Sequence, residues 1–317
     1  PPKLAQESTA GVNLKGDRVN VNKLVEHTDL TNWCVFYDRH SDKPLDNVID
    51  ILKEVADNLK FKIEDPTQGY MVDDKTDLKK LVKDLSSAKN PPQMVLAFVS
   101  RQTSKNLYKE IKRLCHQAGL LTQFFTNYNP SRDTEPSPKF KNLVLQMQAK
   151  LGNNLWSIDT QLADTLVLGA DVYHSKNGRS VASLVGQFGK NLKRTFTETS
   201  MQSGRYEEII ASMSTMFLSI LEHYQKVEKK LPGKVLFYRD GVGQSFIERT
   251  LQAEVGSLIK AMETKYTLKR PKITVVLVTK RISDKFASSD PRPMNPAAGT
   301  VVESGVTELD RATFFMI

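Results

Sequence analysis

Two aspartates follow apolar runs that read as buried strands. Val235–Gly243 (V-L-F-Y-R-D-G-V-G) places Asp240 between such a run and glycines, and Thr165–Tyr173 (T-L-V-L-G-A-D-V-Y) presents Asp171 in the same way. Two strand-end carboxylates in one domain suggest a shared divalent-ion site. Two-metal nucleases use oxygen ligands of this kind to activate a water and to stabilise the leaving oxygen. The pattern therefore indicates metal-dependent cleavage of nucleic acid.

A third carboxylate, Glu208, stands in Gly204–Ile210 (G-R-Y-E-E-I-I), at the expected start of a long helix. The helix dipole favours an acid there. Taken alone, Glu208 reads as an ordinary first-turn acid. The corresponding alternative for Asp171 and Asp240 is a cap or turn residue at the end of a strand.

A second group of residues could hold a phosphate. Tyr108 and Lys112 are four residues apart on a predicted helix and therefore share one face, while Gln123 and Lys150 lie elsewhere. The lysines would neutralise charge, Gln123 would donate a hydrogen bond, and the Tyr108 ring could stack on a base. Singly, each has a simpler interpretation as packing or as a solvated charged face.

The charge balance favours a polyanionic partner. Among 317 residues there are 45 Lys and Arg against 36 Asp and Glu, which gives a formal net charge of +9. The apolar runs fall well short of the roughly 20 residues needed to cross a bilayer, so no membrane association is expected. Cys34 and Cys115 form no C-x-x-C pair, which favours a reducing compartment and excludes a thiolate zinc site.

Residues 1–33 are polar and are expected to form an irregular linker. Helical and strand periodicities then alternate, which predicts a Rossmann-like α/β domain with a parallel sheet over residues 34–157. The expected elements are a strand at 34–37, helices at 45–59 and 78–85, a strand at 94–99, a helix from 104, a strand at 121–125 and a helix ending near 150.

Residues 158–317 show a different order of elements. Three closely spaced strands are expected to be antiparallel neighbours, and the whole order is that of a ribonuclease H core. The expected elements are strands at 165–173, 181–187 and 194–199, a helix at 206–230, a strand ending at 240, a helix at 246–264 and a strand at 273–279. Pro1 and the apolar run Phe314–Ile317 suggest a fragment at both ends.

Five motifs together resemble the Argonaute superfamily, and two of them resemble its Piwi branch. They are G-A-D-V-Y-H at 169–174, E-I-I at 208–210, F-Y-R-D-G-V-G at 237–243, P-x-x-G-T-V from 296 and K-L-G-N-N-L-W at 150–156. The resemblance implies a linker, then a MID domain that binds the 5′ end of a guide, then a PIWI domain that is RNase H-like and C-terminally incomplete.

The resemblance also implies roles for particular residues. Tyr108, Lys112, Gln123, Gln146 and Lys150 fall where the family binds the guide 5′ phosphate and first base, and glutamine at 146 is common in the Piwi branch where the Ago branch has lysine. Asp171 and Asp240 would bind Mg²⁺ or Mn²⁺, and Glu208 would complete the catalytic set.

Two features depart from the family pattern. Gln244, Ser245 and Phe246 follow Gly243, where the family has small or acidic residues and then Gly-Gln. The fourth ligand of the family, a histidine, lies beyond Ile317 in the family pattern. The same segment normally brings the C-terminal carboxylate to the guide phosphate.

The first hypothesis is a guided endoribonuclease in which a piRNA-like guide RNA selects a complementary target RNA by base pairing. The second is a guide-binding scaffold that recruits silencing-pathway proteins without cutting. The third is an RNase H-like integrase or transposase that uses no guide, against which the candidate phosphate pocket argues. Either a nuclear or a cytoplasmic location is compatible with the sequence.

Overall fold

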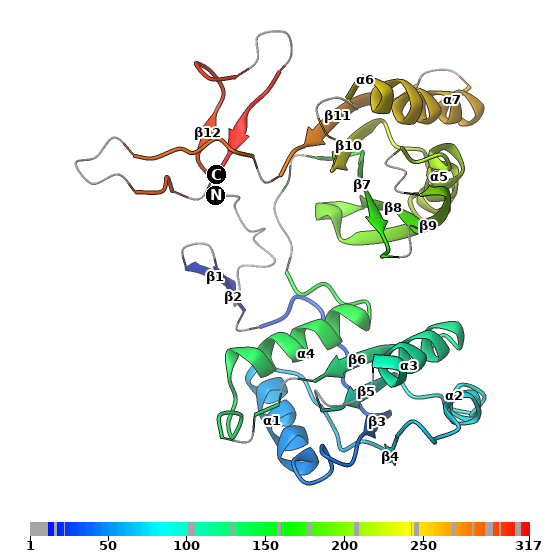
Figure 1. The fold of residues 1–317 in the computed structure, drawn as a ribbon, viewed down its shortest axis with the longest axis vertical. Helices are drawn as coiled ribbons and strands as arrows, with labels where there is room; N and C mark the ends of the chain where they lie inside the picture. Colours follow the sequence, from blue (N-terminus) through cyan, green and yellow to red (C-terminus); the bar gives the residue numbers. More distant parts are fainter. Residues whose placement is uncertain are drawn as a thin grey trace. The chain divides into compact units, whose positions relative to one another are not determined.

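The computed structural model describes residues 12–15, 18–21, 23–100, 105–126, 128–129, 131–156, 160, 162–176, 179–205, 209–241, 243, 247–267, 270–280, 282–288, 294–297, 299–307 and 312–317. These residues form two compact units (Figure 1), one of the described residues up to 156 and one of those from 160 onward.

The first unit is built on a parallel four-stranded sheet of order β4-β3-β5-β6. Its strands are β3 (Trp33–Tyr37), β4 (Gln68–Met71), β5 (Met94–Phe98) and β6 (Thr122–Phe125). Every residue of β5 is buried, because a central parallel strand is covered on both faces. The Rossmann-like expectation for this part of the chain is confirmed, although β4 was not predicted because its residues are mostly exposed.

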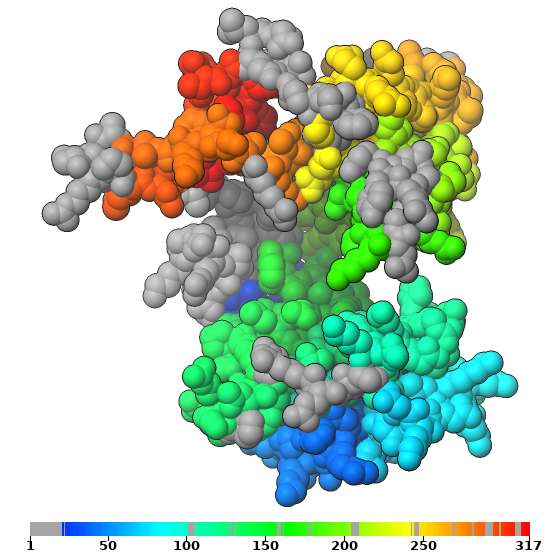
Figure 2. Space-filling model, in the orientation of Figure 1, coloured from blue at the N-terminus to red at the C-terminus, as the bar shows by residue number. Residues whose placement is uncertain are grey.

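Helices cover both faces of this sheet. They are α1 (Leu45–Asn58), α2 (Leu78–Ser86), α3 (Lys105–Gln117) and α4 (Pro138–Lys150). Helix α1 packs against α4, and α2 packs against α3. The side chain of Asp77 caps α2 by accepting a hydrogen bond from the Lys80 backbone N–H at 3.0 Å. In the space-filling view the cyan surface around α2 lies at the rim of this unit (Figure 2).

The two cysteines belong to the core between the sheet and the α2–α3 pair. Burial raises the pKa of Cys34 to about 12 and that of Cys115 to about 11. Both side chains are therefore protonated thiols at neutral pH and act as packing residues.

The expectation of an irregular backbone before residue 33 is wrong at residues 12–15 and 18–21, whereas residues 23–32 contain no helix or strand, as expected. Strands β1 (Val12–Lys15) and β2 (Arg18–Val21) pair as an antiparallel ribbon. The alternation of polar and apolar residues was the signal of a strand. Further along, Leu24 and Leu30 are buried, and Leu30 forms a parallel bridge with Ile63.

The second unit contains a five-stranded sheet of order β11-β10-β7-β8-β9. The strands are β7 (Thr165–His174), β8 (Arg179–Phe188), β9 (Arg194–Arg205), β10 (Lys234–Asp240) and β11 (Lys272–Val278). Strands β7, β8 and β9 are antiparallel neighbours, whereas β10 pairs in parallel with both β7 and β11. This is the expected RNase H-like arrangement.

Two helical segments depart from the predicted bounds. Helix α5 (Met213–Glu228) begins several residues later than expected, since the described residues 209–212 form a bend and a turn. The other predicted helix consists of α6 (Ile247–Thr250), a π-helical turn (Leu251–Val255) and α7 (Gly256–Lys265). Helices α5 and α7 pack together and cover one face of the sheet.

The chain end forms a short ribbon in which β12 (Val301–Val302) pairs antiparallel with β13 (Phe315–Met316). Strand β13 consists of the two central residues of the apolar run Phe314–Ile317. The ring of Phe286 lies 5.0 Å from that of Phe315. Among the residues that the structure describes, no helix is long and apolar enough to cross a membrane.

Gly186 on β8 allows α5 to approach the sheet. A Cβ atom at this position would lie 2.7 Å from Cγ2 of buried Ile220 and 3.3 Å from Cδ1 of Leu166. We expect Gly186→Ala to lower the free energy of unfolding by about 1–3 kcal/mol, because the core must shift to admit the methyl group. The matched control is Gly169→Ala on β7, where a Cβ would meet nothing within 4 Å. Equal denaturant midpoints for the two variants would contradict this account of the packing.

Candidate functional site

The first cluster of candidate residues surrounds β6. Lys112 on α3 donates through Nζ to Oγ1 of Thr122 at 3.2 Å, and Lys150 at the end of α4 donates through Nζ to the carbonyl oxygen of Thr122 at 2.7 Å. Two ammonium groups from different helices therefore meet at one residue of the strand. Neither contact neutralises their charge.

Two aromatic rings border these lysines. The centroid of the Tyr108 ring lies 4.4 Å from that of Phe124, with the planes tilted by 57°, and Nζ of Lys112 lies 5.1 Å from the Phe124 centroid. The Tyr108 side chain is 41% exposed, so part of its surface can meet a ligand. Phe124 was absent from the predicted set, although its alternation with buried Gln123 and Phe125 on β6 places it on the same face as Thr122.

Gln123 is buried beside this cluster. Its Nε2 donates to Oε1 of Gln146 and to the carbonyl oxygen of Phe124, both at 3.0 Å. Its Oε1 has no hydrogen-bond partner among the described residues. Both amide hydrogens of Gln123 are thus engaged, and its contact fixes the exposed side chain of Gln146.

The charges of this cluster favour an anion. The pKa of Lys150 is lowered below its usual value by partial burial of the ammonium group and by the neighbouring ammonium group of Lys112. An anion placed beside both lysines would relieve their repulsion and accept charge-assisted hydrogen bonds. All five residues of the predicted set therefore lie next to β6, with both lysines at Thr122, Tyr108 on Phe124, and Gln123 paired with Gln146.

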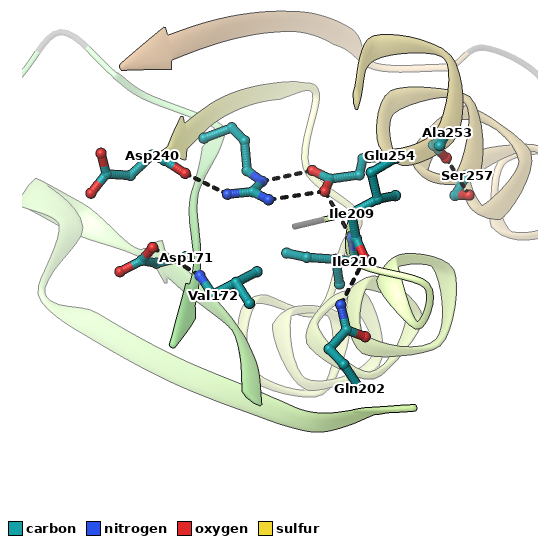
Figure 3. Close-up of polar contacts among 10 residues, drawn as sticks. Asp171, Val172, Gln202, Ile209, Ile210, Asp240, Ala253, Glu254 and Ser257 are labelled. Carbon is teal, nitrogen blue, oxygen red and sulfur yellow. Dashed lines mark hydrogen bonds and ion pairs between the residues drawn. The ribbon is translucent and has the colours of Figure 1, made fainter. Parts of the chain in front are cut away.

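The second cluster lies at the ends of β7 and β10. Arg239 pairs with Ala170 in the parallel register, so Asp240 and Asp171 are the next residues along two adjacent strands. Figure 3 shows both carboxylates pointing to the same side. Gly241, with φ of +80°, lies beside them, and a Cβ there would stand 3.9 Å from Oδ1 of Asp171. The left-handed backbone favours glycine at this position and leaves space next to the carboxylate.

The two carboxylates have different partners. Oδ1 of Asp171 accepts a hydrogen bond from the backbone N–H of Val172 at 2.8 Å, and Asp171 is exposed. Oδ2 of Asp240 accepts from Nζ of Lys280, which follows β11, at 2.5 Å. A divalent cation that binds Asp240 would compete with this ammonium group.

The donor chemistry fits a hard divalent cation in part. Carboxylate oxygens are the ligands that Mg²⁺ takes, usually together with several waters. Within the described ranges, no three or more His, Cys, Asp or Glu side chains gather in a group that could hold a metal ion. Asp171 and Asp240 would therefore supply two ligands, and further oxygens must come from water, substrate or other segments.

Glu208 lies outside the described residues, so its predicted place at the start of a helix stays a prediction. The described helix that follows it, α5, begins at Met213. His174 at the end of β7 lies with Nδ1 2.7 Å from Oγ of Ser180. His223 is half-buried and stacks on Phe196 with ring centroids 4.0 Å apart.

A buried ion pair next to Asp240 was not predicted. Arg239 and Glu254 are both fully buried, and Nε of Arg239 donates to Oε2 of Glu254 at 2.9 Å. Strand alternation carried a signal, because Val235 and Phe237 face the core and Arg239 continues their phase. A charged residue at a core position indicates a buried partner.

Comparison with known proteins agrees with the fold and with these motifs. The family model described as "Piwi domain" matches residues 94–317. Piwi-like protein 1 of Danio rerio is 26% identical over 298 residues, which are 93% of this chain and 34% of that protein. Piwi-like protein 1 of Schmidtea mediterranea is 31% identical over 232 residues, which are 71% of this chain and 27% of that protein.

Solved structures show the same fold. The crystal structure of Drosophila Piwi matches with a TM-score of 0.75 and 22% identity, over 91% of this chain and 39% of that one. The C-terminal lobe of a budding yeast Argonaute matches with a TM-score of 0.76 and 20% identity, over 98% of this chain and 70% of that one. This chain spans about a third of the length of the curated relatives that it matches. From its motifs, its fold and the match to the Piwi domain over most of its length, the chain belongs to the Piwi branch of the Argonaute superfamily.

Proposed function

We propose that this chain is the MID and PIWI portion of a small-RNA-guided silencing protein that cleaves complementary target RNA. The observation that carries the proposal is the convergence of two lysines, two glutamines and a tyrosine on β6. Such a cluster suits the phosphorylated end of a single strand, because it combines positive charge with an exposed ring. The "Crystal structure of Kluyveromyces polysporus Argonaute with a guide RNA" is a structural neighbour with a TM-score of 0.74.

In this proposal residues 34–157 form the guide-binding MID domain. Lys112 and Lys150 neutralise the 5′ phosphate, and Tyr108 stacks on the first base. Gln146 donates a hydrogen bond to the phosphate through its Nε2, since Gln123 engages its Oε1. Gln123 would then act mainly by orienting Gln146.

Residues 158–317 form the PIWI domain, which is proposed to cut. Asp171 and Asp240 would hold the Mg²⁺ or Mn²⁺ ions, with Glu208 as the third carboxylate. When bound, such ions supply activation of a water and stabilisation of the leaving oxygen. The chain recognises the duplex by its backbone and shape, while base pairing selects the sequence. The products are a 3′ hydroxyl and a 5′ phosphate.

One observation favours a scaffold as the second candidate. In the described part of the chain the two aspartates have no third acidic or histidine neighbour for a metal, and Asp240 pairs with Lys280. A guide-binding protein that recruits silencing-pathway proteins needs the β6 cluster but not the aspartates. Either candidate could act in the nucleus or in the cytoplasm. A piRNA-like guide is the proposed ligand in each case.

Guide binding is expected to depend on the 5′ phosphate and on both cluster lysines. We expect Lys112→Met or Lys150→Met in the full-length protein to weaken binding of a 5′-phosphorylated RNA by about 10- to 100-fold, because each removes a charge-assisted hydrogen bond of about 1.5–3 kcal/mol. Binding of the same RNA with a 5′ hydroxyl should change little. Lys109→Met, an exposed lysine on the same helix, is the control. Equal losses of affinity for the 5′-phosphorylated RNA and the 5′-hydroxyl RNA would contradict a phosphate-binding pocket.

Target cleavage is expected to need both strand-end aspartates. Full-length protein loaded with a 5′-phosphorylated guide and given Mg²⁺ should cut a complementary labelled RNA once, at a fixed distance from the guide 5′ end. Asp171→Ala and Asp240→Ala should each reduce the rate by about a thousandfold or more, because each removes a metal ligand. The control Glu263→Ala alters an exposed acid on α7 that pairs with Arg270. If the unchanged protein binds the target tightly in the presence of a guide but does not cut it, the cleavage proposal is rejected and the guide-binding scaffold remains as the function.

Divalent cations are also expected to stabilise the unchanged protein. At a Mg²⁺ concentration ten times the dissociation constant, binding adds about 1.4 kcal/mol to the free energy of unfolding and raises the melting temperature by about 2–4 °C. We expect Asp171→Asn and Asp240→Asn to abolish this shift, because each replaces an anionic ligand by a neutral amide. Differential scanning fluorimetry with Mg²⁺, and with matched ionic strength from NaCl, provides the measurement. If Mg²⁺ raises the melting temperature of both variants as much as that of the unchanged protein, the ion does not bind at these two aspartates.

A further inference from the structure

The buried ion pair Arg239–Glu254 reaches beyond its two members. Oε2 of Glu254 accepts from Nε of Arg239 at 2.9 Å, and Oε1 accepts from Nη2 of Arg239 at 3.2 Å. The same Oε1 accepts the backbone N–H of Ile210 at 2.9 Å. Nη1 of Arg239 donates to the carbonyl oxygen of Asp240. One network thus joins the end of β10 to the segment before α5 (Figure 3).

The peptide group between Ile209 and Ile210 is bound on both of its edges. Its N–H donates to Glu254, and its carbonyl oxygen accepts from Nε2 of Gln202 at 2.7 Å. Gln202 itself is buried on β9. A peptide that is held on both edges has one orientation, so the chain direction on either side of it is defined.

Stability alone is a poor reason for this arrangement. Two fully buried charges lose their hydration, and well-packed apolar residues of similar volume are often as stable or more so. Glu254 also lies in the π-helical turn Leu251–Val255, a geometry that is rare and concentrated at functional sites. The network therefore connects the end of β10 to the segment before α5 at some cost in stability.

We propose that Glu254 is a positioning residue for target cleavage. Through Arg239 it is tied to the strand end that carries Asp240, and through the Ile209–Ile210 peptide it is tied to the segment that carries Glu208 one position before Ile209. Glu254 thereby sets the alignment of one proposed catalytic carboxylate against the other by acting through the backbone next to each of them. The inference rests on the proposed cleavage function.

The decisive variant is Arg239→Met with Glu254→Met in the full-length protein, which exchanges the ion pair for apolar side chains of similar length. We expect this double variant to melt at or above the temperature of the unchanged protein. Its affinity for a phosphorylated guide should be unchanged, since the β6 cluster is in the other unit. Its single-turnover cleavage rate should fall by about 10- to 100-fold, because misplacement by about 1 Å has effects of that size.

Two further variants separate positioning from folding. Glu254→Gln retains the volume and an oxygen acceptor for the Ile210 N–H, and it should keep more activity than Glu254→Met does. Ser257→Ala removes the hydrogen bond from Oγ of Ser257 to the carbonyl oxygen of Ala253 in the same helix, and it should cleave at the unchanged rate. A folded double variant that cuts as fast as the unchanged protein would overturn the proposal.

Amide hydrogen exchange distinguishes this proposal from the cleavage function on which it rests. Exchange at Ile209–Ser212 should accelerate in the double variant, while exchange in the five-stranded sheet is unaffected. Unaltered protection at Ile210 would overturn the positioning role, whether or not the protein cuts. If the unchanged protein binds target without cutting, cleavage is overturned, and the exchange data still decide whether Glu254 holds this peptide.

Discussion

The register between β7 and β10 is the constraint on which the second unit depends. Successive residues of a strand face opposite sides of its sheet, and the parallel pairing sets Arg239 beside Ala170. As a result the two aspartates share one face, while Arg239 enters the core on the other. A slip of one residue would move a carboxylate into the core and the guanidinium out of it. The placement of the two aspartates and the packing of the core are therefore two consequences of one hydrogen-bond ladder.

Much of the fold could be predicted because long elements have strong periodicity. The parallel strands of the first unit, the antiparallel β7–β9 and the helices that cover them follow from apolar spacing. Strand β4 could not be predicted, since its exposed residues lack an apolar pattern. The start of α5 was missed for a different reason. The residues before Met213 look helical in sequence, but the Ile210 N–H bonds to the side chain of Glu254 from another helix.

The candidate residues were predictable to the extent that their chemistry is visible in their type. The charge of a lysine or an aspartate is evident from its residue type, and the motifs indicated which strand or helix carries each one. Gln123 illustrates what remained hidden. Its predicted role was donation to a ligand, whereas the fold uses both of its amide hydrogens for Gln146 and for the backbone. Phe124, which lies beneath Lys112, and the Arg239–Glu254 pair depend on contacts between distant segments, which spacing along a sequence does not describe.

The π-helical turn between α6 and α7 has a consequence for how this region can tolerate change in chain length. Such a turn holds an extra residue relative to an α-helix, and each residue of an α-helix advances by about 100° around its axis. Deleting one residue from Leu251–Val255 would restore regular α geometry and leave α7 in nearly the same rotation about the helix axis, because the π turn holds the extra residue within one turn. A deletion within α7 itself would instead rotate the residues beyond it by about 100° and turn Leu258, Ala261 and Met262 away from the core. Changes in chain length are therefore better tolerated at the turn than in the helix that follows it.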